Sequence, residues 1–491
     1  MIHDKKKSLL KDTTYYTIAN YISQGLGMVN SVAMRRFMGP TAMGIWSIIQ
    51  VILGYCGYAS FGTTKAMARD YPILRGKGAH EKADKLKDIV FTFSMTMSLI
   101  PATLILGYLA VKHQSIEHPL MVGLFFLSIF LFIQRFNDLL LNLLRSDKKF
   151  TILSQLIVIN AVGGLAVTFL FVRSWNIYGL LLGTLLTTTG SIIFIYSQYP
   201  YHFKRYWNNQ ELLTELRLGI PLVAATFLGE LLKSIDKWVI TKYLGFYELG
   251  QYSLAIMASG YVFSLPNMFS HIWYPNLQQE YGKEGSIEGI KNYLLTPVHI
   301  FSILCPIMCG LAIYMISWIA VHFLPKFVPG LPAMKIYLIG TFFLLFSQFS
   351  YSFLITINRY LTNIPVVIVA IGINAALGVM LVKSGLGLPG VALSTVVSYF
   401  VYGIGMYAVA LSYMHSPSLI FKNISKELLT VTYLFSAVFL CDHFVTIKNL
   451  ELQTITKILL LLSASSPFLI ALEKKTNILK HVYELLLHKE K

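Results

Sequence analysis

The chain has 491 residues, of which 55% are hydrophobic and only 13% are charged, and its mean hydropathy is +0.62. Soluble globular domains carry about 25% charged residues, so this composition excludes a soluble protein and predicts an integral membrane protein. The net charge of +17 does not indicate nucleic-acid binding, because the Lys and Arg residues cluster in short segments between apolar runs.

Apolar runs of membrane length recur from the start of the chain to its end. A helix needs about 20 apolar residues to cross the hydrocarbon layer. The first run follows a basic start but has no small-residue cleavage site, so we expect a retained helix and not a removed signal peptide. Fourteen runs predict an all-α integral membrane protein with about 14 transmembrane helices: 13–34, 44–64, 89–111, 118–140, 152–172, 178–197, 218–241, 251–272, 293–322, 334–356, 363–382, 388–412, 428–447 and 455–472.

The Lys and Arg residues between these runs are distributed unequally. With a cytoplasmic N-terminus, 27 of the 40 lie in cytoplasmic segments and 10 in external ones. This bias follows the positive-inside rule and predicts that both termini are cytoplasmic. The external segments are all short, so we expect no soluble domain on that side.

A glycine pair is written twice in the sequence. Gly39 and Gly44 stand between the first two runs, and Gly245 and Gly250 repeat their spacing 206 residues later. Three further anchors follow in the same order, at offsets between 203 and 214. Matched anchors at nearly constant offsets indicate an internal repeat.

Each copy of the repeat holds six predicted helices, and an even number makes the two copies parallel. We therefore predict an N-terminal lobe of residues 1–206 and a C-terminal lobe of residues 207–415 around a central cavity. Residues 416–491 would add two extra helices and a basic cytoplasmic tail. The tail from Glu473 carries apolar residues among lysines, which fits either a helix lying on membrane lipids or an ordinary solvated tail.

The predicted helix 218–241 carries four ionisable residues: Glu230, Lys233, Asp236 and Lys237. Each would cost about 2.5–3.5 kcal/mol at the bilayer centre, so they are expected to face protein or water. On a continuous helix they fall within an arc of about 120°, which predicts one charged stripe. Such a stripe favours a substrate or ion site. The alternative is a structural stripe in which Lys233 pairs with Glu230 and Asp236.

The first copy of the repeat has polar but uncharged residues on the corresponding face. Gln24 corresponds to Glu230, and Asn30 corresponds to Asp236. A cavity between two such helices would have one amide wall and one charged wall.

Three further cations lie toward the cytoplasmic side. Lys65 and Arg69 follow the second run, and Arg135 lies in the fourth. Ammonium and guanidinium groups at the mouth of a cavity suit an anionic phosphate headgroup. The alternatives are topology signals for Lys65 and Arg69 and a structural ion pair with Asp138 for Arg135.

We find no catalytic constellation and no ATP-binding loop in the sequence. The four cysteines lie in apolar runs, and Cys305 and Cys309 alone supply too few ligands for a metal. We therefore predict a transporter that is not an enzyme, with no catalytic residues, no cofactor, no metal and no nucleic-acid partner.

The sequence resembles the polysaccharide flippases of the multidrug/oligosaccharidyl-lipid/polysaccharide exporter superfamily, Wzx-type O-antigen and capsule translocases in particular. The resemblance covers roughly residues 10–415. It is carried by the run 244–254 with the preceding 234–237, by 275–277 with 281–282, and by the first-copy segments 37–47 and 61–62.

The resemblance implies a flippase of the bacterial cytoplasmic (inner) membrane. Its substrate would be an undecaprenyl-pyrophosphate-linked oligosaccharide repeat unit for surface polysaccharide, such as lipopolysaccharide O-antigen or exopolysaccharide. It also implies alternating access coupled to H⁺ or Na⁺, and polysaccharide polymerase and assembly proteins as partners. Glu230 and Asp236 would then be the coupling carboxylates, and Lys233, Lys237, Lys65 and Arg69 would hold the anion.

Two other functions remain open. A multidrug or organic-cation antiporter of the same superfamily would favour carboxylates without lysines, whereas the helix 218–241 carries equal numbers of each. A membrane glycan polymerase or ligase would present a large external loop, and the external segments here are short.

Overall fold

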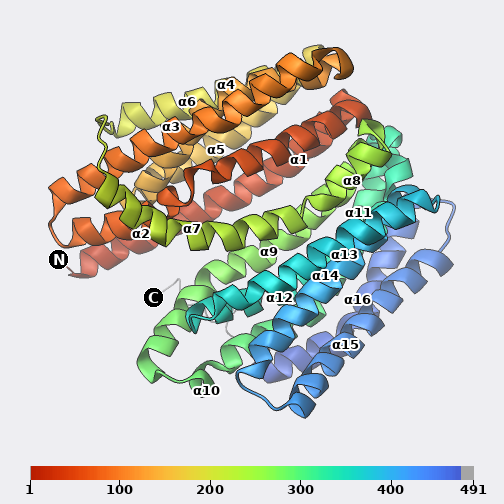
Figure 1. The fold of residues 1–491 in the computed structure, drawn as a ribbon. Helices are drawn as coiled ribbons and strands as arrows, with labels where there is room; N and C mark the ends of the chain where they lie inside the picture. Colours follow the sequence, from red (N-terminus) through yellow and green to blue (C-terminus); the bar gives the residue numbers. More distant parts are fainter. Residues whose placement is uncertain (1, 477–491) are drawn as a thin grey trace. The chain divides into compact units, whose positions relative to one another are not determined.

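The computed structural model describes residues 2–476, and helices make up nearly all of this part of the chain (Figure 1). The described residues contain no β-strand. The prediction of an all-α protein is therefore confirmed. The tail beyond Thr476, for which two alternatives were open, lies outside the described residues.

Eleven helical segments of the described chain are long and apolar enough to cross a membrane. Two of them, Thr17–Ser60 and Phe150–Gln198, have 44 and 49 residues. At 1.5 Å per residue each would be more than about 60 Å long, twice the hydrocarbon thickness. Each is bent at one residue with non-helical backbone angles, so each supplies the two crossings that the sequence predicts.

The two bends lie next to each other. Gly39 has φ 74° and ψ 176°, and Asn176 has φ 53° and ψ −129°. The Asn176 side chain donates a hydrogen bond from Nδ2 to the carbonyl of Met38 at 3.3 Å. Glycine and asparagine are the residues that tolerate a positive φ most readily.

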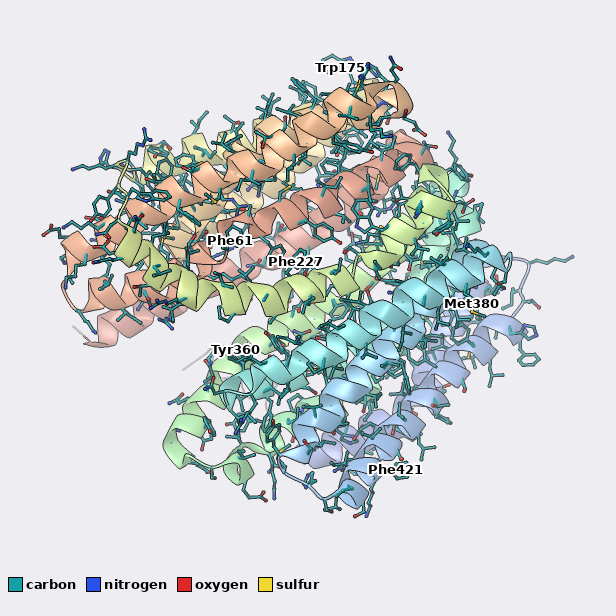
Figure 2. The ribbon with its side chains drawn as sticks, viewed as in Figure 1. Phe61, Trp175, Phe227, Tyr360, Met380 and Phe421 are labelled. Atoms are coloured by element: carbon teal, nitrogen blue, oxygen red, sulfur yellow. The ribbon has the colours of Figure 1, made fainter. Side chains whose placement is uncertain are left out.

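Membrane crossing also explains the outer surface. Trp175, Met380 and Phe421 have 55%, 65% and 75% of their surface exposed, and Figure 2 shows them on the outside of their helices. Apolar side chains in these positions are stable in lipid and costly in water. The chain is a multi-pass membrane protein.

The helices divide into two compact units. The first comprises Met1–Thr241 and Gly245–Gly250, and the second comprises Lys242–Leu244 and Gln251–Lys491. The first unit holds α1 (Ile2–Cys56), α2 (Thr63–Gly76), α3 (His80–Lys112), α4 (His118–Ser146), α5 (Phe150–Val167), α6 (Arg173–Gln198), α7 (Asn209–Leu232) and most of α8 (Ile235–Tyr243).

The second unit begins within α9. Its helices are α9 (Phe246–Glu284), α10 (Ile287–Ile290), α11 (Asn292–Phe323), α12 (Leu331–Thr356), α13 (Asn363–Lys383), α14 (Gly387–Ser412), α15 (Pro417–Phe444) and α16 (Leu450–Thr476). α9 covers the predicted crossing 251–272. Buried aromatic rings on α12 and α14 form the centre of this unit.

Helices α7 and α8 pack with the first unit, although the repeat assigns them to the second copy. A close approach of two glycines holds α7 there: a Cβ on Gly62 would lie 2.4 Å from the carbonyl oxygen of Gly219. Gly62 also has φ +80°, so a side chain here would be strained as well as crowded. The lobe boundary between residues 206 and 207 describes the repeat and stays a prediction.

The glycine turns show the repeat directly. A Cβ on Gly44 would lie 1.9 Å from the carbonyl oxygen of Phe246, and a Cβ on Gly250 would lie 1.8 Å from that of Pro40. Phe246 follows Pro40 by 206 residues, and Gly250 follows Gly44 by the same offset. The same contact is therefore made twice with the roles exchanged, as in a two-fold interface.

A second pair of contacts uses the same residue types in both copies, although the two serines do not correspond in the repeat. Ser191 donates a hydrogen bond to Asn160 Oδ1 at 2.8 Å in the first unit, and Ser394 donates one to Asn374 Oδ1 at 3.2 Å in the second. The two asparagines are one of the anchor pairs in the sequence. Each copy thus joins its fifth and sixth helices through an amide and a hydroxyl.

Candidate functional site

The charged helix is not continuous. α7 ends at Leu232 and α8 begins at Ile235, with a turn at Lys233 and Ser234 between them. The expectation of one unbroken helix over 218–241 is wrong at this point, so the 120° arc does not describe the four charges. Broken helices within membrane proteins place free backbone groups and charged side chains around binding sites.

The break is held by Ser234 and by two aromatic residues, Tyr55 of the first copy and Trp238 of α8. Ser234 Oγ donates to the carbonyl of Glu230 at 2.6 Å, which satisfies a carbonyl freed by the break. The same hydroxyl lies 2.5 Å from Tyr55 OH, and Tyr55 OH accepts a hydrogen bond from Trp238 Nε1 at 3.2 Å. Tyr55 thus connects both sides of the break to α1.

The four charges fall into two groups. Glu230 and Lys233 precede and form the turn, are about half exposed, and pair with each other at 3.4 Å. Asp236 is fully buried in the first turn of α8, and its Oδ1 accepts the backbone N–H of Lys237 at 2.8 Å. A carboxylate in this position is stabilised by the free N–H groups of the helix start.

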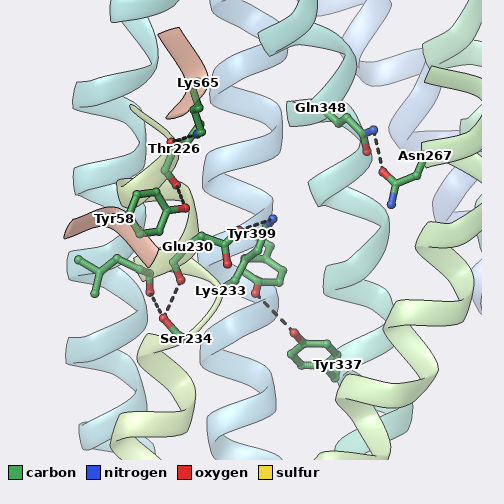
Figure 3. A network of polar contacts seen from close by, with 11 residues as sticks. Tyr58, Lys65, Thr226, Glu230, Lys233, Ser234, Asn267, Tyr337, Gln348 and Tyr399 are labelled. Atoms are coloured by element: carbon green, nitrogen blue, oxygen red, sulfur yellow. Dashed lines mark hydrogen bonds and ion pairs between the residues drawn. The ribbon is translucent and has the colours of Figure 1, made fainter. Parts of the chain in front are cut away.

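Lys65 joins α2 to α7 (Figure 3). Its Nζ donates to Thr226 Oγ1 at 2.9 Å, and Tyr58 OH donates to the carbonyl of Thr226 at 3.4 Å. Burial lowers the pKa of Lys65, and the negative charge of Glu230 acts in the opposite direction. Lys65 is therefore a cation placed between the charged turn and the interior of the first unit.

A cavity of about 340 Å³ lies within the first unit on the other side of Lys65. Its polar lining is formed by Tyr58, Ser60, Thr64, Lys65, Arg135, Asp138, Asn142 and Arg145. Three cations and one carboxylate give this lining an excess of positive charge. The arrangement can bind a multiply charged anion, with the guanidinium groups as planar donors and the ammonium as a point charge.

Arg135 is the most enclosed of these cations. Only 9% of its surface is exposed, and one Nη donates to the carbonyl of Cys56, the last residue of α1, at 2.9 Å. Its Nε is buried and has no hydrogen-bond partner among the described residues. Asp138, the predicted partner, accepts a hydrogen bond from Gln134 at 3.0 Å and lines the same cavity.

The sequence analysis missed Arg145 and Asn142. They share a stripe of α4 with Arg135 and Asp138, at spacings i, i+3, i+7 and i+10, within an arc of about 80°. That stripe is visible in the sequence. In the sequence, Arg145 stands beside Lys148 and Lys149 and therefore counts among the cytoplasmic topology signals.

The remaining candidates lie elsewhere in the first unit. Arg69 is exposed, and its guanidinium donates to the neighbouring Asp70 at 2.6 and 3.2 Å. Gln24 is exposed on α1. Asn30 packs close to Gly164 of α5, and its Oδ1 is buried without a hydrogen-bond partner among the described residues. Their roles, and those of the four charges, stay predictions.

A family model described as "Polysaccharide biosynthesis protein" matches residues 9–279, which is 271 of the 491 residues. The chain belongs to the polysaccharide biosynthesis protein family. The matched part contains α1 to α8, and therefore the cavity and the broken helix. A sequence search of curated proteins finds no significant match.

Solved structures show which fold this polysaccharide biosynthesis protein has. The lipid II flippase MurJ in an inward closed conformation aligns with a TM-score of 0.68 at 16% identity, over 93% of this chain and 99% of MurJ. An inward-facing multidrug resistance MATE family transporter of the MOP superfamily aligns with a TM-score of 0.60 at 17% identity, over 83% and 95%. A variant of the Vibrio cholerae MATE transporter VcmN gives 0.56 at 14% identity, over 84% and 98%. The chain has the MOP superfamily fold.

Proposed function

We propose that this protein is a flippase that moves undecaprenyl-pyrophosphate-linked oligosaccharide repeat units across the bacterial inner membrane, with both termini in the cytoplasm. It would supply the biosynthesis of surface polysaccharides such as O-antigen or exopolysaccharide, with polymerase and assembly proteins acting after it. Membership of the polysaccharide biosynthesis protein family supports a lipid-linked glycan as cargo. The fold is that of a lipid II flippase and of MATE transporters, so we infer transport by alternating access and no catalysis.

The observation that carries this proposal is the cationic cavity of the first unit. A pyrophosphate carries at least two negative charges, and Lys65, Arg135 and Arg145 exceed the single carboxylate Asp138 by two. The guanidinium group of Arg135, which lines the cavity, can donate to a phosphate oxygen. Arg135 is buried, and a buried cation in a membrane protein is costly unless an anion lies near it.

The same excess argues against a drug antiporter. A cavity for organic cations would be lined by carboxylates, and this one has more cations than carboxylates.

Translocation of an anion against its gradient needs an energy source, and we infer coupling to H⁺ or Na⁺. Asp236, buried at the start of α8, and Glu230 at the break are the carboxylates proposed for this role. Lys233 and Lys237 would hold the substrate anion as it passes the break in the helix.

The test uses a strain that lacks this gene but retains its glycan-assembly enzymes. Lipid-linked intermediates are extracted, and their glycan length and membrane leaflet are determined. We expect single repeat units on the cytoplasmic leaflet, and we expect the wild-type protein to release them. Units already on the outer leaflet but never polymerised would refute the flippase.

Variants then locate the site. Arg135→Met should trap the repeat units although the protein is present in the membrane, and Arg135→Lys should restore part of the flux because it keeps the charge. Arg36→Met is the matched control, because this arginine is exposed on α1 and does not line the cavity. A Glu230→Gln, Asp236→Asn double variant that still releases the units would remove these carboxylates from the mechanism.

A further inference from the structure

The second unit contains a buried carboxylate that the proposed substrate site does not use. Glu427 lies in α15, about 15 Å along the helix from its start at Pro417, and only 5% of its surface is exposed. α15 is one of the membrane-length segments. Ionisable residues in such positions pair with one another and mark ion pathways.

The carboxylate is held from α11 by two side chains. His299 Nδ1 lies 3.1 Å from each carboxylate oxygen, and Ser302 Oγ donates to Oε2 at 2.6 Å. The histidine side chain is 18% exposed, whereas that of Glu427 is 7% exposed. The imidazole is thus the more accessible partner and offers a proton a route to the buried carboxylate.

Two further titratable groups act on Glu427. Tyr407 of α14 is buried, and Lys426 of α15 is exposed next to Glu427. With a neutral imidazole, His299 and Glu427 together carry one buried negative charge. One added proton makes them neutral overall. Burial favours that uptake, and imidazole is the side chain that normally titrates between pH 5 and 8.

We propose that His299 and Glu427 form a proton-binding site of the second unit, separate from the carboxylates at the helix break, and that its proton is one coupling ion of the translocation proposed above. The inference therefore rests on the proposed function. The site joins α11 of the repeat to α15 of the added helices. Gaining or losing the proton changes how strongly the two helices attract each other, and so shifts the conformational equilibrium of the unit.

A second acidic residue of α15 is a natural control. Asp442 lies near the other end of the helix, where it accepts hydrogen bonds from Lys335 Nζ and, at 2.8 Å, from Lys457 Nζ. Two lysines keep this carboxylate ionised, so it holds α15 in place without exchanging a proton near neutral pH.

The first experiment measures proton uptake without transport. Purified full-length protein in phosphatidylethanolamine and phosphatidylglycerol liposomes is taken from pH 8 to pH 5, and bound protons are counted. Glu427→Gln should take up about one proton fewer than the wild type, and Asp442→Asn should match the wild type. NMR of labelled histidine, assigned with His299→Gln, should show His299 titrating in this range. Equal uptake by the wild type and Glu427→Gln, or a silent His299, would overturn the site.

The second experiment measures flipping of a fluorescent undecaprenyl-pyrophosphate disaccharide in the same liposomes under an imposed proton gradient. The gradient should accelerate the wild type and Asp442→Asn, and Glu427→Gln should lose that acceleration. A variant that loses the proton but keeps the acceleration would overturn the coupling. Absence of flipping by every protein, with the difference in proton uptake intact, would support the site and refute the proposed function instead.

Discussion

Replacement of Gly250 by alanine tests whether the two glycine turns form a two-fold contact. The added Cβ would lie 1.8 Å from the Pro40 carbonyl oxygen, and such pairs are almost never closer than 3.0 Å. The backbones must therefore separate by about 1.2 Å or more, because neither contact atom lies on a flexible side chain. Overpacking of this kind costs about 1–3 kcal/mol, and a backbone contact belongs at the upper end of that range.

The measurement is the apparent melting temperature of the purified protein in detergent. Gly44→Ala makes the equivalent clash at 1.9 Å with Phe246, so it should lower the melting temperature by a similar amount. Gly260→Ala is the control in the same helix as Gly250, because its Cβ would meet nothing within 4 Å. Gly260→Ala should leave the free energy of unfolding unchanged or raise it by up to about 1 kcal/mol.

We therefore expect Gly250→Ala and Gly44→Ala to lower the melting temperature clearly, and Gly260→Ala to leave it unchanged or raise it slightly. If Gly250→Ala has the same melting temperature as the wild type, the close contact between Gly250 and the Pro40 carbonyl does not exist. If only one of the two turn variants is destabilised, the contact exists but is not two-fold, and the structural support for the repeat at this point is lost.

Three further changes test other parts of the molecule. Tyr201, in the loop after α6, is buried and donates to Asp147 at 2.8 Å; burial first and then this hydrogen bond raise its pKa above the ordinary 10.0. The stabilisation that this hydrogen bond gives the fold should therefore be complete below pH 10 and decrease as the pH rises further. In urea unfolding, Tyr201→Phe should lower the free energy of unfolding by about 1.5–3 kcal/mol at neutral pH, and the variant should no longer show this decrease at alkaline pH. Tyr55→Phe and Ser234→Ala should show a coupling energy of about 0.5–1.5 kcal/mol in a double-mutant cycle, whereas additive effects would separate Tyr55 from the helix break. Gly310→Leu should cost about 1–3 kcal/mol in thermal unfolding, because its Cβ position is 2.5 Å from Leu461, and an unchanged melting temperature would mean that α16 does not pack there.

Composition and hydropathy determine the fold class and the membrane crossings, because burial in lipid acts on every residue of a crossing in the same way. The glycine turns were also predictable. Gly39 bends α1 where the sequence separates two crossings, and the spacing of Gly44 and Gly250 reflects a contact that no larger residue fits. These features depend on local pattern or on strict steric exclusion.

The site was less predictable because its parts depend on distant residues. The break at Lys233 and Ser234 interrupts a run that reads as one helix, and it is held by Tyr55, which is 179 residues away from Ser234. Periodicity describes a helix correctly only while the helix continues. The packing of α7 against α2 could not be predicted either, since the repeat assigns them to different copies.

The charges of the first unit distinguish a structural from a functional explanation. A structural network would balance its charges, because an unbalanced buried charge destabilises the fold. Glu230 and Lys233 are balanced and exposed, so the pair carries no net charge in this state. The cavity on α4 is different, because its cations outnumber the carboxylate and Arg135 leaves a buried donor unused. The unbalanced cluster is therefore where an anionic substrate gains most.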